Sequence, residues 1–334
     1  MSIEIVTEEE KCNDIVADLN NDDHNPIIGD FQFKRVLNDH FSPDASLFFC
    51  KHGECLPLVH KGGVVYFYGG NMPFNDYNSV DFKSNLFDEA INWLVGQKYE
   101  FSLTSICSDY YDRISVSNQK YDVPYNQDWQ FLNVPGFSEE SVVKNSSKKR
   151  RGKFRRVLNN RADYRFDSVS PGDFLGHWSK IVLNKMVDNF DIRSKNNIWK
   201  QNNELFYDII NYMLGHFDCE IRLAFNRAAE LVGFYFLVFH EAFSHVLFCN
   251  SFAKGDQNVT PLLYFDLLGV SKESGTHRVS AGRGNFGYKK RMGFTAVPMY
   301  SFVKNSSWNI EYNEDLSKEE SLLLYGRDFG ALSV

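Results

Sequence analysis

The first half of the chain alternates between strand-like and helix-like spacing of its hydrophobic residues. From residue 46 to residue 65, short apolar runs are separated by the polar sequences KHGE and HKGG, which is typical of consecutive antiparallel strands. Further on, apolar residues recur every three or four positions, which predicts a helical face made of Leu86, Phe87, Ala90, Ile91 and Leu94. The alternating sequence EFSLTSI then predicts a strand. We therefore expect strands, a helix and a further strand, in that order.

The second half places helices before a group of strands. The pattern predicts a helix after Ser147 and two more around Trp178 and Ile209. The runs CEIRLAF, ELVGFYFLVF and SHVLFCNSF then predict an antiparallel meander. A helix with Pro261 in its first turn and Gly275 after its end follows, and a short strand, the loop GRGNFG and the strand AVPMYSFV complete the order. This half is expected to be an α+β layer of helices on an antiparallel-rich sheet.

The length of the chain indicates two domains. Its 334 residues exceed the roughly 250 to 300 residues at which a single hydrophobic core stops growing. We expect one domain over residues 1–145 and a second over 146–303. The tail, residues 304–334, contains EDLSKEESLLLYG, which predicts a short helix that packs on the body. With 43% hydrophobic and 24% charged residues, the chain has the composition of a folded globular protein.

The charge and the apolar runs limit the partners. A net charge of −7 disfavours non-specific nucleic-acid binding, because neutralising phosphates needs a basic face, so DNA is not an expected partner. No stretch reaches the roughly 18 apolar residues that a membrane span needs, and the opening MSIEIVTEEEKCND lacks the features of a signal peptide. We therefore expect a cytoplasmic protein without a membrane span. Six cysteines at irregular spacing predict free thiols rather than a disulfide framework.

Four residues in the first half have a spacing that zinc sites loosely permit: Cys50, His52, Cys55 and His60. Two cysteines at the ends of neighbouring strands are more typical of core thiols. We therefore expect no metal.

Several segments together resemble a known family. The basic sequence SKKRRGKFRRVLNN, the meander, the helix opened by proline and the closing GRGNFGYKKRMGF are similar to the CelD-type acetyltransferase domain of the GNAT superfamily (GCN5-related N-acyltransferases). The Fem peptidyltransferases are its wider relatives. In the first half, LPLVHKGGVVYFYGGNMPFNDY is similar to the N-terminal half of the same proteins, so the resemblance spans about residues 30–303. Its most specific part is the set Gly284, Tyr288, Lys289, Gly293 and Phe294.

The resemblance implies a fold, an activity and two donors. It implies two tandem GNAT-like domains, each a mixed, mostly antiparallel sheet flanked by helices, with a cleft between them. The implied activity is N-acyl transfer to the amine of a small molecule or precursor, from acyl-CoA or, as in Fem relatives, from aminoacyl-tRNA. GNAT enzymes hold CoA pyrophosphate with an Arg/Gln-x-x-Gly-x-Gly/Ala loop, and the corresponding AKGDQNVTPLLY lacks that spacing. Both donors therefore stay open, as does a third alternative, a non-catalytic ligand-binding protein.

The candidate catalytic residues come from three places. Lys289 follows the glycine loop, where an ammonium can face a phosphate or a developing oxyanion, and the resemblance assigns such a role to it. Tyr288 is its neighbour, although a core position is its more ordinary role. Attack by an amine also needs a base, for which Asp109 after the first-half strand and the pair His240 and Glu241 after the long buried strand are candidates. Each of these is also an ordinary surface residue type.

The candidate donor-binding residues are mostly cations. Seven lysines and arginines lie between residues 148 and 156 of an otherwise acidic chain, and they can clamp phosphates of CoA or of tRNA. A solvated helix face or a localisation signal is the alternative. With the helix cap and the loop glycine, the proposed donor-binding set is Lys149, Arg150, Lys153, Arg156, Asn258 and Gly284.

Overall fold

The structure is a computed structural model, and its described residues form two compact units. The first unit comprises residues 1–128 and 297–334, and the second comprises residues 129–296. The domain and tail boundaries expected above stay predictions. The described residues are 4–7, 25–70, 72, 74, 75, 78, 84–107, 125–192, 198–253, 256, 258–283 and 287–304.

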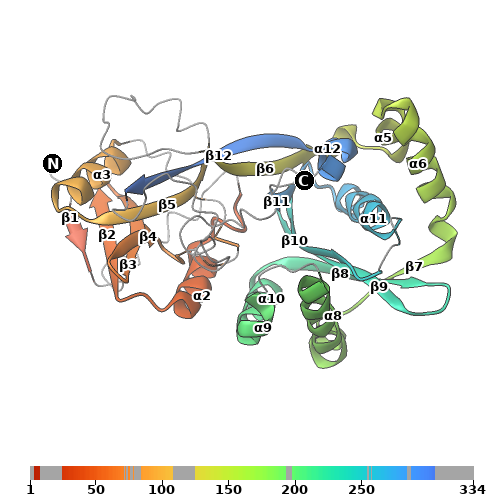
Figure 1. Ribbon diagram of the computed structural model, residues 1–334, viewed down its shortest axis with the longest axis horizontal. Helices are drawn as coiled ribbons and strands as arrows, with labels where there is room; N and C mark the ends of the chain where they lie inside the picture. Colours follow the sequence, from red (N-terminus) through yellow and green to blue (C-terminus); the bar gives the residue numbers. More distant parts are fainter. Residues whose placement is uncertain are drawn as a thin grey trace. The chain divides into compact units, whose positions relative to one another are not determined.

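The first unit is a sheet with a helix on each face (Figure 1). Its strands, in spatial order, are β1 (Glu4–Val6), β2 (Ala45–Lys51), β3 (Glu54–Lys61), β4 (Val64–Phe67), β5 (Glu100–Cys107) and β12 (Thr295–Lys304). Its helices are α2 (Phe31–Phe41) and α3 (Leu86–Gly96). Alternate residues of β2 point to opposite faces, so Leu47 and Phe49 pack in the core under α3 while Phe48 packs with Phe31 of α2.

The second unit is a larger layered sheet. Its strands, in spatial order, are β6 (Tyr125–Asn133), β11 (Arg278–Arg283), β10 (Phe243–Ser251), β9 (Leu231–His240), β8 (Asp218–Asn226) and β7 (Tyr164–Ser168). Its helices are α5 (Glu139–Asn145), α6 (Lys148–Asn159), α7 (Pro171–Asp173), α8 (Ser179–Ile192), α9 (Ile198–Gln201), α10 (Asn203–His216), α11 (Val259–Glu273) and α12 (Gly287–Met292). Short helical turns lie at η3 (Val134–Gly136), η4 (Arg161–Asp163) and η5 (Phe174–Trp178).

Helices cover both faces of this second sheet, which explains the continuous apolar run in β9. Tyr235 and Leu237 pack in the core that contains α6 and α11. Phe236 lies on the opposite face, where its ring contacts Phe174 of η5, and α8, α9 and α10 lie on that side in Figure 1. A strand buried on both faces has no polar face, so it does not alternate in sequence.

The two units repeat one order of strand pairing. In each, an antiparallel hairpin leads into a helix, and the next strand pairs in parallel with the last strand of that hairpin. The parallel pair is β4 with β5 around α3 in the first unit, and β10 with β11 around α11 in the second. An antiparallel strand then closes each sheet, β12 beside β5 and β6 beside β11.

Most of the predicted elements are present. Helix α3 begins at Leu86, Ser147 is the N-cap of α6, and α11 has Pro261 in its first turn and Gly275 just after its end. One element was not predicted: GYKKRM forms the short helix α12 between the expected loop GRGNFG and the last strand. The predicted tail helix lies outside the described residues.

Candidate functional site

The parallel strands of the second unit separate after three residue pairs. β10 pairs with β11 from Phe243 with Arg278 to His245 with Ser280. Beyond His245, β10 continues to Ser251 and pairs with β9, with a bulge after Val246. β11 also changes its register against β6 after Ser280, where Gly282 has a φ of +67° that glycine adopts without strain. Backbone groups that face such a separation are available to a ligand.

Lys289 reaches this separation from α12. Its side chain is buried rather than exposed on a loop, and Nζ donates to the carbonyl oxygen of Ala281 over 2.6 Å. Ala281 directly follows Ser280, the last residue of β11 that pairs with β10. The positive charge of Lys289 also acts on the pKa values of His245 and Cys249, so the ammonium lies close to β10.

Three buried side chains form a polar cluster beside Lys289. The indole Nε1–H of Trp129 donates to Ser280 Oγ over 2.8 Å, and Ser280 Oγ lies 3.0 Å from His245 Nδ1. The rings of Trp129 and His245 are stacked, with centroids 6.0 Å apart. Burial, and then the charge of Lys289, lowers the pKa of His245 to about 3. The imidazole is therefore neutral at physiological pH.

The thiol of Cys249 is also neutral. Burial raises its pKa to about 12, against the opposing effect of the Lys289 charge. Neither Cys249 nor His245 therefore carries a negative charge that would neutralise the Lys289 ammonium. A buried ammonium stabilises a substrate that acquires negative charge.

The predicted basic helix exists and its cations face solvent. Phe154 and Val157 of α6 are buried, and the Phe154 ring contacts Phe265 of α11 at 5.8 Å. The exposed residues of α6 include Lys148, Lys149, Arg150, Arg151, Lys153, Arg155 and Arg156. The apolar face of α6 thus packs against α11, while its charged side chains stay in water.

One cation of α6 lies near a cation of α12. Burial, and then the charge of Arg150, lowers the pKa of Arg291. Two guanidinium groups from different helices therefore lie close to each other, two residues along α12 from Lys289. An anion placed between them relieves their repulsion and accepts hydrogen bonds from both.

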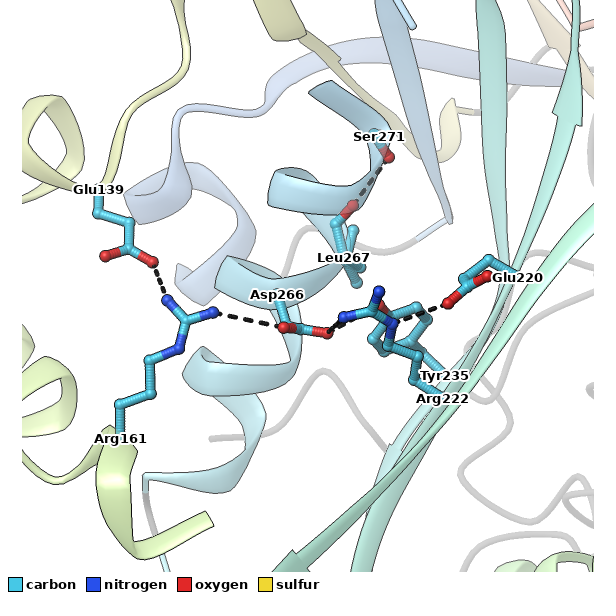
Figure 2. Close-up of polar contacts among 8 residues, drawn as sticks. All are labelled: Glu139, Arg161, Glu220, Arg222, Tyr235, Asp266, Leu267 and Ser271. Carbon is cyan, nitrogen blue, oxygen red and sulfur yellow. Dashed lines mark hydrogen bonds and ion pairs between the residues drawn. The ribbon is translucent and has the colours of Figure 1, made fainter. Parts of the chain in front are cut away.

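An ion-pair network centred on the buried carboxylate of Asp266, which the sequence analysis missed, anchors α11 (Figure 2). Asp266 Oδ1 accepts from Arg161 Nη2 at 3.3 Å, and Oδ2 accepts from Arg222 Nη1 at 3.2 Å and from Tyr235 Oη at 2.8 Å. Only 7% of the Asp266 side chain is exposed. Burial, and then the nearby carboxylate, raises the pKa of Tyr235. The sequence signal was a single carboxylate inside the apolar run LLYFDLLGV.

Two further carboxylates complete this network. Glu139 of α5 bonds the second arm of Arg161 at 2.6 Å, and Glu220 of β8 bonds Arg222 at 2.8 Å. Arg161 lies directly after the last turn of α6. The network therefore fixes the end of the basic helix against α11 and the sheet.

The other predicted site residues lie elsewhere or outside the described chain. His240 and Glu241 are exposed at the turn between β9 and β10, and the His240 ring contacts Phe217. Asn258 is the N-cap of α11, without a side-chain cap bond, and its N–H donates to Asp256. Asp109, Gly284 and the side chain of Tyr288 lie outside the described residues. The structure thus groups Lys289 with Trp129, His245 and Ser280, which the sequence analysis did not select.

A polar pocket of about 560 Å³ in the first unit is a weaker candidate for a functional site. It is lined by Lys51, His52, Gly53, Glu54, Ser84 and Asn85. Its polar groups bond one another, as in the 2.6 Å contact of Lys51 Nζ with Asn85 Oδ1.

Among the described residues, no group of three or more His, Cys, Asp or Glu is arranged to hold a metal ion. None of the described helices is both long and apolar enough to cross a bilayer.

The chain is similar in fold to several solved structures, of which three are described here. The C-terminal domain (DUF2156) of a putative lysylphosphatidylglycerol synthetase from Agrobacterium fabrum matches with a TM-score of 0.55 and 12% identity over 89% of this chain and 91% of that one. FemX matches with a TM-score of 0.53 and 10% identity over 91% and 98%. A tandem GNAT protein from the clavulanic acid biosynthesis pathway matches with a TM-score of 0.50 and 11% identity over 90% and 97%.

These matches cover nearly the whole chain at an identity that shows only the fold. No protein-family model and no curated protein matches the sequence. The predicted α+β class with two tandem GNAT-like halves is confirmed, as is the resemblance to GNAT and Fem proteins. The chain therefore has the tandem GNAT fold that FemX and the lysylphosphatidylglycerol synthetase domain share with it.

Proposed function

We propose that this protein is an acyltransferase that moves an acyl group from an activated donor to an amine, with its chemistry at Lys289. The observation that carries the proposal is the buried Lys289 ammonium where β10 and β11 separate. The amine nitrogen bonds to the carbonyl carbon, the carbonyl electron pair moves to oxygen, and the leaving group then departs as the amine loses a proton. Lys289 stabilises the developing oxyanion, an effect that is strong in a site with little water.

Acyl-CoA is the first proposed donor. Its phosphates suit the cations near Arg150 and Arg291, and the proposed contacts include Lys149, Lys153 and Arg156. Asn258 and Gly284 stay proposed donor contacts at the start of α11 and in the glycine loop. The proposed acceptor is an amine on a small molecule or precursor in the cytoplasm.

The length of α6 supports a second donor, aminoacyl-tRNA. Its seven cations lie between Lys148 and Arg156, a stretch of helix about 12 Å long. This length exceeds one pyrophosphate and matches a run of backbone phosphates. The proton acceptor stays a choice among Asp109, His240, Glu241 and water, while His245 is too weak a base at a pKa of about 3.

The experiment is a binding panel followed by a transfer assay. Melting temperatures are measured with acyl-CoAs, free CoA, uncharged tRNA and aminoacyl-tRNA, and release of CoA or tRNA is then followed with candidate amines. Transfer should fall at least about 1,000-fold in Lys289→Ala, and Lys180→Ala, on the exposed surface of α8, is the matched control. If no donor supports transfer, the protein is the non-catalytic alternative. If Lys289→Ala transfers at the wild-type rate, the chemistry lies elsewhere.

A further inference from the structure

The hydrogen bonds of the buried cluster determine where His245 carries its hydrogen. The indole of Trp129 can only donate, so Ser280 Oγ accepts from it. The single hydroxyl hydrogen of Ser280 then has one acceptor among the described residues, His245 Nδ1 at 3.0 Å. A neutral imidazole that accepts at Nδ1 carries its hydrogen on Nε2. Among the described residues, this is the tautomer that gives the hydrogens of both the Trp129 indole and the Ser280 hydroxyl an acceptor.

The Nε2–H group has no hydrogen-bond partner among the described residues. Only 2% of His245 is exposed, so bulk water does not hydrate the ring as it does a surface histidine. Among the described residues, the fully buried side-chain polar atoms without a partner are Asn25 Nδ2, Asn75 Oδ1 and Thr276 Oγ1, and His245 Nε2 is not one of them. The Nε2 atom therefore keeps some accessible surface, through which a ligand can accept from it. His245 is also the last residue of β10 that pairs with β11, and Lys289 is near enough to affect it electrostatically.

We infer that His245 is a second hydrogen-bond donor to the reacting carbonyl oxygen, acting through Nε2–H beside the ammonium of Lys289. This role rests on the proposed acyl transfer. As the amine attacks, the carbonyl oxygen becomes an oxyanion that accepts hydrogen bonds from both groups. The electron pair on this oxygen re-forms the carbonyl double bond when the leaving group departs. No proton moves to the oxygen, and His245 stays neutral throughout. A neutral imidazole serves here because it donates without adding a second buried charge.

The tautomer can be measured without any substrate. Nitrogen-15 NMR of histidine-labelled protein at pH 7 should show one ring with its hydrogen on Nε2, and this signal should disappear in His245→Gln. In Ser280→Ala the signal should broaden or shift, because the group that selects the tautomer is lost. A His245 hydrogen on Nδ1, or a charged ring at pH 7, overturns the inference.

Two substitutions then test the role in the reaction. The amide nitrogen of His245→Gln reaches the place of Nε2, whereas that of His245→Asn reaches only the place of Nδ1. We expect kcat to fall by about 100- to 1,000-fold in His245→Asn and by less than about tenfold in His245→Gln. KM and the melting temperature should be equal in the two variants. Equal kcat values in both variants would overturn this role alone, whereas absence of transfer by the wild type would overturn the proposed function and this role with it.

Discussion

In each unit a pair of parallel strands separates, and different groups bond the strand edge that the separation leaves. The strand that follows the helix continues past a residue with positive φ, Ser105 in β5 and Gly282 in β11. In the first unit, Asn78 bonds β5 beyond its pairing with β4, with its N–H on Ser105 O and its amide on Thr104 O. In the second unit, the corresponding edge bonds the Lys289 ammonium.

This difference indicates which unit carries chemistry. A backbone segment and a neutral amide close the first separation, and the remaining oxygen of that amide accepts from Lys34. The Lys289 ammonium lies at the second separation, where an oxyanion could accept from it and from the Nε2–H that we infer for His245. One pairing order thus serves as a scaffold in one half and as a candidate site in the other.

The largest expected effect on stability is in the second unit. Asp266→Ala leaves Arg161 and Arg222 without their shared carboxylate and should lower the free energy of unfolding by about 3 kcal/mol. Hydrogen exchange resolved by peptide should quicken in α11 and not in β5. Asp167→Ala removes an exposed ion pair with Arg165 as the control, and an equal loss there would mean that the burial of Asp266 contributes nothing.

A smaller effect is expected from opening the first unit. Asn78→Ala removes the bonds to Thr104 O and from Lys34 Nζ while keeping its backbone N–H, and should cost about 2 kcal/mol. Transfer activity should stay within about threefold of wild type, since the lost contact belongs to the scaffold half. Asn85→Ala, at an exposed position, is the control. A loss of transfer as large as that in Lys289→Ala would show that both separations take part.

The stability of the second unit should depend on pH through His245. Its folded pKa of about 3 lies below the reference value of 6.5, so the unfolded chain binds the extra proton between these values. The free energy of unfolding should therefore fall by about 1.4 kcal/mol per pH unit as the pH decreases below about 6.5. Denaturant titrations of wild type and His245→Gln between pH 7 and pH 5 measure this difference. Parallel curves would mean that folding does not change the pKa of His245.

The smallest effect should come from the surface of α6. Reversing one charge in Arg150→Glu should weaken donor binding by about 1 kcal/mol at low salt, and added salt should reduce the effect. Lys180→Glu, on the opposite face of the second sheet, controls for net charge. If both variants bind the donor equally, α6 is a solvated helix rather than a phosphate site.

The sequence predicted the elements whose periodicity is strong. The meander β8 to β10 and the helices α3 and α11 were evident because their apolar spacing is regular. β6 was missed because YNQDWQFLN mixes polar residues into a strand, and α12 because six residues after a glycine loop show no period. The sequence pattern thus predicted the long elements with regular apolar spacing, and it did not predict the short or polar ones.

The candidate site was predictable only in part. Lys289 was selected from the resemblance, but its burial could not be predicted. Its ammonium bonds Ala281 in β11 and lies near β10, and only the fold brings these strands to α12. His245 and Ser280 appear in the sequence as single polar residues in apolar strands, and nothing local shows that their side chains meet. Such clusters depend on strand register, which a single sequence does not determine.

Hydrogen exchange with a bound donor analogue tests the central claim most directly. The protein is measured alone, with a non-hydrolysable acyl-CoA thioether, and with tRNA that carries its amino acid through an amide. We predict that one of these analogues slows exchange in residues 243–251 and 278–292, where β10, β11 and α12 meet. Protection confined to residues 64–67 and 100–107 would place the ligand in the first unit and contradict the account.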